Sequence, residues 1–266
     1  GFVMSDWGGV HSAAKAVNAG LDQESAAEIF DKEIYFDKPL RDALAKGEVK
    51  QARIDDMVRR ILRSFFAAGV FEHPAKKAPI DEKANLAVAR ETLEAGAVLL
   101  RNDNQLLPLD VAKLESVAVI GAHADKGVLA GGGSSLVTAK GGNAVPGLKP
   151  GDWPGPVMYH PYSPLKALQS MAPKATVQFA GGDDVAGAAA LAAKSQVAVV
   201  FVQKWAGEDF DARDLSLPDD QDALVTAVAK ANPRTIVVLE NGSPVAMPWL
   251  EQVGAVLEVW YPGGDA

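Results

Sequence analysis

Two acidic segments of the sequence carry side chains that could catalyse a reaction. Asp6 follows a short apolar run at residues 2–4, and Glu208 lies in an acid-rich loop at residues 207–211. The apolar run predicts the last residues of a buried parallel strand, so Asp6 would lie in a βα loop, where barrel enzymes hold their catalytic residues. Hydrolysis of a glycosidic bond needs two carboxyl groups, here delivered from separate parts of the chain. The pair therefore predicts a glycosidase-like site.

The carboxylate of Asp6 has a structural alternative, which is to cap the N-terminus of the following helix. Ser12 is better placed for capping, because two glycines separate Asp6 from the helix that we predict from Ser12 onward. Both a catalytic or ligand-binding role and a capping role therefore stay open for Asp6, and the spacing argues against capping.

The loop around Glu208 also allows other interpretations. A solvated acidic loop is the simplest, since acidic side chains are mostly exposed. A calcium loop fits poorly, because Arg213 stands where an oxygen ligand is needed and Asp214 where the sharp turn needs glycine. Trp205 and Phe210 are unusual in a solvated loop and could stack on a sugar ring or shield a carboxyl group. Such shielding, with the neighbouring carboxylates, predicts a raised pKa for Glu208, as a general acid requires.

The sequence predicts neither a cofactor nor a metal. Glycine-rich stretches after residue 120 and at residues 131–135 lack the spacing of a dinucleotide fingerprint or a phosphate loop. The sequence contains no cysteine, which excludes disulfides, thiolate metal sites and cysteine nucleophiles. The four histidines are scattered without the spacing of a zinc site: His11, His73, His123 and His160.

Composition narrows the classes of partner. The apolar fraction of 48% and the charged fraction of 23% are ordinary for a globular protein. A net charge of −8 without a basic stripe argues against a nucleic-acid partner, and no apolar run is long enough to predict a membrane span. The sequence begins inside a predicted strand and ends where a parallel-sheet domain would continue, so we expect a piece of a longer protein, and the compartment stays open.

Two domains are predicted on either side of a linker. Apolar positions between residues 53 and 62 recur on one face of a helix, and we assign residues 1–72 to the last part of a (β/α)₈ barrel. The stretch 73–82 is rich in proline and lysine and predicts a linker. Residues 83–266 alternate strands with helices, which predicts an α/β domain with a mostly parallel sheet. Its predicted strands are 97–100, 117–120, 175–179, 197–202, 235–239 and 255–260, its predicted helices are 81–95, 163–171, 184–194 and 219–231, and long loops are predicted at 130–135 and 141–156.

Motifs along nearly the whole sequence resemble the family 3 glycoside hydrolases of the β-glucosidase and exo-β-glucanase type. Ser5-Asp6-Trp7 is similar to the segment around the nucleophile of that family, and Ala19-Gly20-Leu21-Asp22 to the segment that follows it. Further ordered matches are Arg53-Ile54-Asp55, Val98-Leu99-Leu100-Arg101-Asn102, Leu106-Leu107-Pro108-Leu109, Gly131-Gly132-Gly133-Ser134, Leu215-Ser216-Leu217-Pro218 and Trp260-Tyr261-Pro262-Gly263-Gly264.

The resemblance implies a barrel followed by an α/β sandwich, with retaining hydrolysis of terminal β-D-glucosyl residues. It implies Asp6 as the nucleophile and Glu208 as the acid/base, with Trp7 and Trp205 binding substrate. Asp209 and Ala212 depart from the Gly and Arg of the family loop, although Arg213 is adjacent. The implied partners are a β-glucoside or β-glucan oligosaccharide and the missing barrel portion of the same enzyme, and a periplasmic or extracellular location is implied by the resemblance alone.

A second function is left open by the short barrel segment. A barrel that cannot close has unpaired strand edges. If residues 1–266 were the whole polypeptide, we would expect an inactive carbohydrate-binding or structural module instead of a hydrolase.

Overall fold

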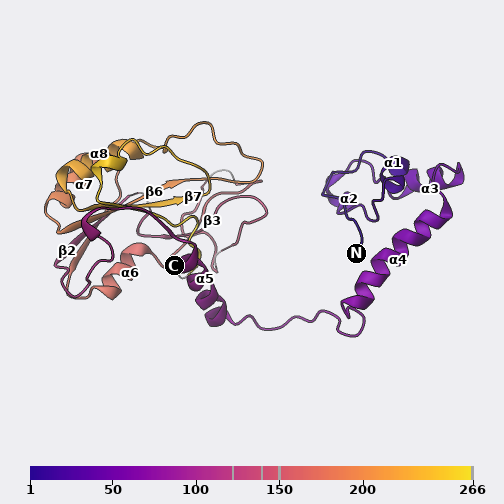
Figure 1. Ribbon diagram of the computed structural model, residues 1–266, viewed down its shortest axis with the longest axis horizontal. Helices are drawn as coiled ribbons and strands as arrows, with labels where there is room; N and C mark the ends of the chain where they lie inside the picture. Colours follow the sequence, from indigo (N-terminus) through magenta and orange to yellow (C-terminus); the bar gives the residue numbers. More distant parts are fainter. Residues whose placement is uncertain (122, 139, 149–150, 265–266) are drawn as a thin grey trace. The chain divides into compact units, whose positions relative to one another are not determined.

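The chain forms two separate units in the computed structural model, which describes residues 1–121, 123–138, 140–148 and 151–264. Contacts divide it into Gly1–Ile80 and Asp81–Ala266 (Figure 1). This boundary falls inside the linker predicted at 73–82, and residues 74–80 contain neither helix nor strand. Residues 149 and 150 of the predicted loop 141–156, and the last two residues of the sequence, lie outside the described residues.

The first unit is helical. Its core gathers four buried apolar side chains from three helices and one loop: Val17, Ala43, Val49 and Met57. Ser12 begins the first helix as predicted, because its hydroxyl accepts a hydrogen bond from Lys15 N–H at 3.3 Å. The helices are α1 (Ala13–Asn18), α2 (Ala27–Phe30), α3 (Lys38–Ala45) and α4 (Gln51–Ala67).

The strand predicted at residues 2–4 is reduced to a single parallel bridge between Met4 and Gln23. The prediction that this run is buried is wrong for the described chain, since Val3 is 49% and Met4 54% exposed. The physical reason is that only the segment near Gln23 pairs with it, so the outer faces of both side chains have no neighbour among the described residues.

Asp22 joins the strand remnant to α4. Its side chain is fully buried, and its carboxylate makes the contacts. It accepts hydrogen bonds from Val3 N–H at 2.9 Å, from Arg53 at 2.8 Å and from Arg60 at 2.8 Å. Burial alone would raise the pKa of Asp22, but these three bonds together outweigh it and hold the pKa below its ordinary value. Arg53 also donates to the carbonyl oxygens of Val17 and Leu21.

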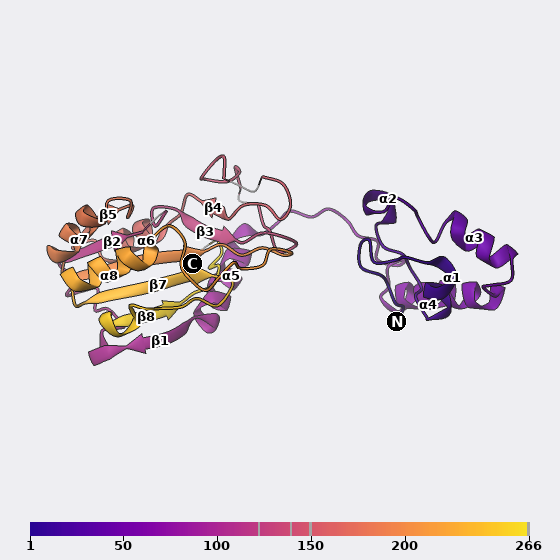
Figure 2. The ribbon, with the colours of Figure 1, turned by 90° about the horizontal axis from the view of Figure 1, so that it is seen from above.

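The second unit is built on a six-stranded sheet in the order β1-β8-β7-β6-β2-β5. All neighbouring strands are parallel except β1 and β8 (Figure 2). Each predicted strand exists, and the mostly parallel α/β sandwich is confirmed. The strands are β1 (Val98–Asn102), β2 (Ser116–Ile120), β5 (Thr176–Ala180), β6 (Val197–Lys204), β7 (Thr235–Asn241) and β8 (Ala255–Glu258).

Helices cover both faces of this sheet, so both faces are apolar. Val200 and Leu239 pack against α7 (Val185–Ala193) and α8 (Gln221–Ala231) on one face. Val199 and Val238 belong to the core on the other face, beside α6 (Pro164–Met171) and the end of α5 (Glu82–Gly96). Figure 1 shows α7 and α8 above the sheet and α6 below it.

A two-stranded hairpin is the main element that the sequence does not predict. Strands β3 (Gly127–Ala130) and β4 (Met158–His160) pair antiparallel and enclose the predicted glycine-rich loops. Val128 and Tyr159 anchor the hairpin in a small core that also contains Trp205 and Tyr261. Among the described helices, none has the length and the apolar character needed to cross a membrane.

The Asp22 cluster predicts the effect of Asp22→Asn on the first unit. The substitution keeps the shape of the side chain but leaves Arg53 and Arg60 without their buried anion. We expect the free energy of unfolding of the first unit to fall by about 2 kcal/mol. The loss is smaller than for the breaking of a fully buried ion pair, because Arg60 is partly exposed. Hydrogen exchange of the α1 and α4 amides should then accelerate about thirtyfold.

The surface pair of Asp37 and Arg41 provides the control, since both side chains are exposed and Asp37→Asn should change exchange by less than about threefold. The folded pKa of Asp22 is depressed, so its stabilisation is complete above about pH 4 and disappears as the pH falls through the folded pKa. Equal exchange in the wild type and Asp22→Asn at pH 7 would contradict this role.

Candidate active site

The glycine tract of residues 131–133 and the loop after β6 meet beyond the carboxyl ends of the parallel strands. Gly132 forms a parallel bridge with Gly207, and Gly132 N–H donates to the Ala206 carbonyl at 3.0 Å. Gly133 N–H donates to the carbonyl of Pro154, which brings the 151–156 segment to the same place. The backbone of the tract therefore fixes the position of residues 205–208.

Side chains cannot be accommodated in this tract. A Cβ at Gly132 would lie 2.5 Å from the Pro154 carbonyl oxygen and 2.9 Å from the indole of Trp205. A Cβ at Gly133 would collide with Glu208, and the φ of +90° at Gly133 is one that L side chains rarely adopt. The resemblance in sequence at residues 131–133 therefore has a physical cause, which is close backbone approach.

Glu208 is exposed, and its carboxylate is bound by the residue after this tract. Ser134 N–H donates to Glu208 Oε2 at 2.7 Å. Hydrogen bonds from the side chain and the backbone of Ser134 hold the pKa of Glu208 below its ordinary value. The raised pKa that the sequence predicts is therefore wrong for the described chain, because Glu208 is solvated and bonded instead of buried among apolar groups.

Raised carboxyl pKa values occur instead at two buried residues near the ends of β7 and β8. Burial raises the pKa of Glu240 to about 8. Burial also raises the pKa of Glu258, although Glu258 accepts a hydrogen bond from Trp260 N–H at 2.8 Å. The sequence analysis missed both acids because they continue apolar strands.

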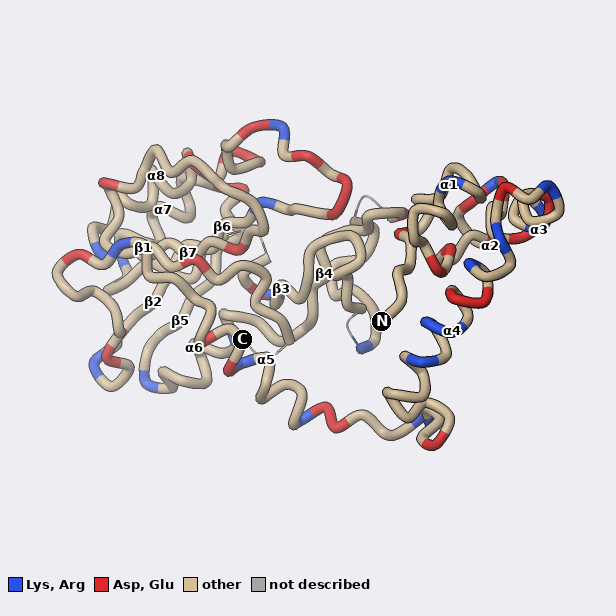
Figure 3. Tube along the Cα trace, turned by 45° about the vertical axis from the view of Figure 1, so that its right-hand side comes forward, with Lys and Arg blue, Asp and Glu red and all other residues tan. Residues whose placement is uncertain are grey.

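The two ends of the Glu208 loop are tied to Lys204 of β6 and to Tyr261, which follows β8 (Figure 3 shows several acidic positions in this loop). Ala206 N–H donates to the hydroxyl of Tyr261 at 2.7 Å, and the Lys204 ammonium donates to the carbonyl of Asp214. Phe210 N–H closes a tight turn on the Gly207 carbonyl at 3.2 Å. Tyr261 was not predicted as a site residue, although its Trp-Tyr-Pro-Gly-Gly motif marked the segment.

Trp205 is half-buried beneath the loop. Its ring meets Phe210 edge to face, with ring centroids 4.9 Å apart. The indole nitrogen is buried and has no hydrogen-bond partner in the described part of the chain. The two aromatic residues that the sequence associates with Glu208 are therefore brought together.

Asp6 lies in the first unit, in a turn after the strand remnant. One oxygen of its carboxylate accepts Trp7 N–H at 2.8 Å, and Gly9 N–H donates to the Asp6 carbonyl at 3.2 Å. The preceding residue is fixed on both sides, because Ser5 N–H donates to Gln23 and Ser5 Oγ accepts Ser25 N–H. Asp6 therefore presents its other carboxylate oxygen to solvent.

Trp7, 55% exposed, stacks on Phe30 with ring centroids 4.8 Å apart and an interplanar angle of 9°. The structure thus gathers the predicted site residues as two groups, one around Asp6 and one around Glu208. Within the described residues, no group of three or more His, Cys, Asp or Glu side chains is arranged to hold a metal ion.

Residues 97–266 match the C-terminal domain of glycosyl hydrolase family 3. The chain therefore belongs to glycosyl hydrolase family 3, and its second unit contains the C-terminal domain of that family. This confirms the resemblance seen in the sequence motifs.

Curated relatives align along the entire chain. Thermostable β-glucosidase B of Acetivibrio thermocellus is 34% identical over 274 residues, with coverage of 100% of this chain and 33% of the relative. A probable β-glucosidase L of Aspergillus terreus is 33% identical over 294 residues, with coverage of 100% and 39%. The chain therefore spans 33% to 39% of the length of these relatives.

Solved structures share the fold. β-Glucosidase D2-BGL of Chaetomella raphigera has a TM-score of 0.80 and 29% identity, with coverage of 100% of this chain and 40% of that protein. DesR, a β-glucosidase of Streptomyces venezuelae in complex with D-glucose, has a TM-score of 0.80 and 26% identity, with coverage of 99% and 47%.

The Ser134 contact predicts the titration of Glu208. In the chain of residues 1–266, we expect the pKa of Glu208 to lie below about 4.3, the ordinary value for glutamate. The ¹³C NMR shift of its carboxyl carbon, followed against pH, measures this pKa. Ser134→Ala removes the hydroxyl but keeps the N–H, so the pKa should rise part of the way back. Ser135→Ala is the matched control and should leave it unchanged; a Glu208 pKa insensitive to Ser134→Ala would exclude the hydroxyl contribution.

Proposed function

We propose that the intact protein hydrolyses terminal β-D-glucosyl residues from β-glucosides or short β-glucans with retention of configuration. Membership of glycosyl hydrolase family 3 and the β-glucosidase names of the aligned relatives support this activity. The observation that carries the proposal is the glycine tract, which fixes an exposed glutamate at the carboxyl ends of a parallel sheet.

Asp6 is the proposed nucleophile. In retaining hydrolysis a carboxylate attacks the anomeric carbon, while a second carboxyl group about 5 to 5.5 Å away protonates the leaving oxygen. Asp6 suits attack because its backbone is fixed by Ser5 and Gly9 while one carboxylate oxygen has no partner among the described residues. Trp7, held flat against Phe30, is the proposed sugar-binding surface beside it.

Glu208 is the proposed acid/base. A general acid must begin protonated, whereas the contact with Ser134 favours the carboxylate. We propose that covering of the loop by substrate and by the barrel portion removes water and breaks the Ser134 contact, so that the pKa of Glu208 rises. Trp205 and Phe210, already packed together, would provide the apolar surface of this covered state.

The remaining barrel portion of the enzyme is the proposed partner. Residues 1–72 would supply the end of that barrel, with 73–82 as the linker and 83–266 as the sandwich domain. The glucose-bound state of DesR supports glucose as the sugar that this active site would recognise.

Asp6→Ala in the intact enzyme should lower kcat/KM on an aryl β-glucoside by at least about 10⁴-fold, the scale of losses when a catalytic nucleophile is removed. Glu28, an exposed acid of the same unit, offers the control, and Glu28→Ala should retain activity. Ordinary turnover by Asp6→Ala would end the nucleophile assignment.

Glu208→Ala should lower the rate of hydrolysis by an amount that depends on the leaving group of the substrate. We expect losses of about 10² to 10⁴-fold with a poor leaving group such as an alkyl glucoside, and a much smaller loss of glycosylation rate with 2,4-dinitrophenyl glucoside. Glu115→Ala, at the opposite end of β2, is the control. Equal losses on both substrates would argue against an acid role.

A further inference from the structure

A recess lies at the carboxyl ends of the sheet, on the side of α7 and α8. Its volume is about 560 Å³, within the roughly 300 to 1,000 Å³ typical of small-molecule sites. It is lined by residues that follow β2 at His123 and β5 at Gly181–Asp183, by Gln203 near the end of β6, and by Trp205 just after β6. We call it the α7/α8 cavity.

The topology of the sheet favours this cavity as a ligand site. From β2 the chain crosses by α6 to β5, whereas from β6 it crosses by α8 to β7 on the other side. Ligands of open α/β sheets bind in the crevice where the strand order reverses, outside the carboxyl ends of the strands. A cavity of about 660 Å³ beside Pro233 and Gly254 lies at the opposite, amino ends of β6 to β8 and lacks this topological support.

The floor of the α7/α8 cavity is a fixed polar network. Burial raises the pKa of Tyr159, so its hydroxyl stays protonated and donates to Gln203 Oε1 at 2.7 Å. Gln221 holds the Gln203 backbone on both sides, accepting its N–H and donating to its carbonyl, each at 2.9 Å. The side-chain NH₂ of Gln203 makes no hydrogen bond within the described residues. It is a preorganised donor that lines the cavity.

Aromatic rings form part of the wall. Trp205 and Tyr159 line the cavity, and the ring of His123 lies against Tyr159 with centroids 5.0 Å apart. Flat apolar faces of this kind cover the C–H surface of a pyranose ring, while neighbouring polar groups bind its hydroxyls.

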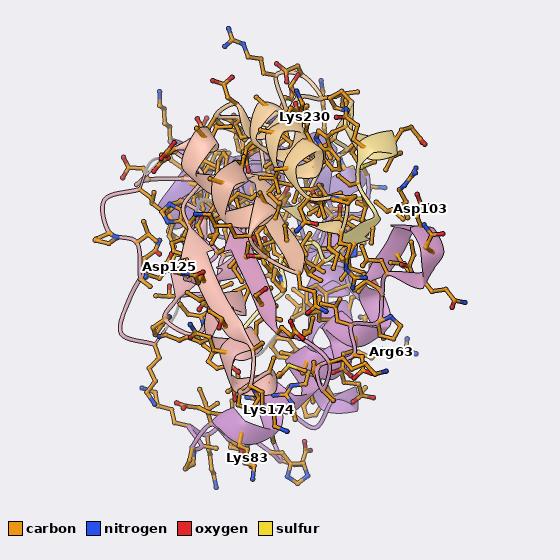
Figure 4. The ribbon with its side chains drawn as sticks, turned by 90° about the vertical axis from the view of Figure 1, so that its left-hand side faces the viewer. Arg63, Lys83, Asp103, Asp125, Lys174 and Lys230 are labelled. Atoms are coloured by element: carbon orange, nitrogen blue, oxygen red, sulfur yellow. The ribbon has the colours of Figure 1, made fainter. Side chains whose placement is uncertain are left out.

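The acidic residues at the rim of the cavity disfavour a negatively charged ligand. Asp183, Asp219 and Asp220 are exposed there, and none of the described residues that line the cavity is Lys or Arg. Asp220 precedes α8 without a side-chain capping bond, so its carboxylate is not occupied by the helix. The basic residue of α8, Lys230, is in its last turn and extends outward (Figure 4). This rim repels anions and offers acceptors to hydroxyl groups.

We propose that the α7/α8 cavity is a second carbohydrate site, which binds one or two neutral pyranose units through Gln203, the aromatic wall and the acidic rim. Its lining does not include Glu208, so its occupation by sugar does not require the proposed hydrolysis. Trp205 links the two, because it lines the cavity and also contacts Phe210 in the loop of Glu208.

Calorimetric titration of the chain of residues 1–266 with cellobiose and with glucose tests this site. We expect binding in the millimolar range, weakened at least about fivefold by Asp183→Ala, which removes an exposed acceptor without touching the core. Val185→Trp, at the start of α7, should fill the cavity and abolish binding. Circular dichroism checks that this half-buried substitution leaves the fold intact, and the exposed Glu94→Ala is the matched control.

The proposal would be overturned by no binding by the wild-type chain at tens of millimolar sugar, by unchanged binding in both cavity variants, or by tighter binding of glucose 6-phosphate than of glucose. Loss of binding in Glu208→Ala, with the cavity variants unaffected, would place the sugar at the loop and equally reject the cavity. Aryl glucoside hydrolysis by the intact enzyme is read separately, so failure here is distinguishable from failure of the proposed hydrolase.

Discussion

The close approach of the glycine tract at residues 131–133 to the segment 205–208 is the constraint on which the arrangement of the loops beyond the sheet depends. Without side chains at residues 131–133, one backbone can lie directly against the other and against Pro154. This contact joins the β3–β4 hairpin, the loop after β6 and the long segment before β4 into one surface. It therefore decides where Glu208 stands, which side of Trp205 is covered, and how the hairpin core packs on the sheet.

Much of this fold could be predicted from local sequence. Apolar, largely β-branched runs mark the central strands, and Ser12 and Asp81 begin helices through side-chain capping bonds. The hairpin was harder, because β3 and β4 are short and border glycine-rich loops, so neither shows a strand period. Its stability comes from Tyr159 packing on residues far along the chain, which no local window contains.

In the candidate site, too, the sequence predicts some features and not others. The carboxylates and aromatic residues were visible as residue types in suggestive loops, but their environments were not. Ser134 is 74 positions from Glu208, and its contact reverses the expected direction of the pKa shift. Asp22 was visible as part of a motif, yet its burial between Arg53 and Arg60 depends on how α4 folds back. Charge environment is a property of tertiary contacts, and sequence spacing alone does not give it.

The tight turn from Gly207 to Phe210 separates the anchored part of the loop from residues 211–213. The turn is closed by main-chain atoms, and the three residues beyond it are exposed and make no hydrogen bond to any described residue. Their side chains can therefore be exchanged with little effect on the position of Glu208. That short stretch is therefore a place where the sequence can vary, by evolution or by protein engineering, while the main-chain contacts that hold Glu208 stay the same.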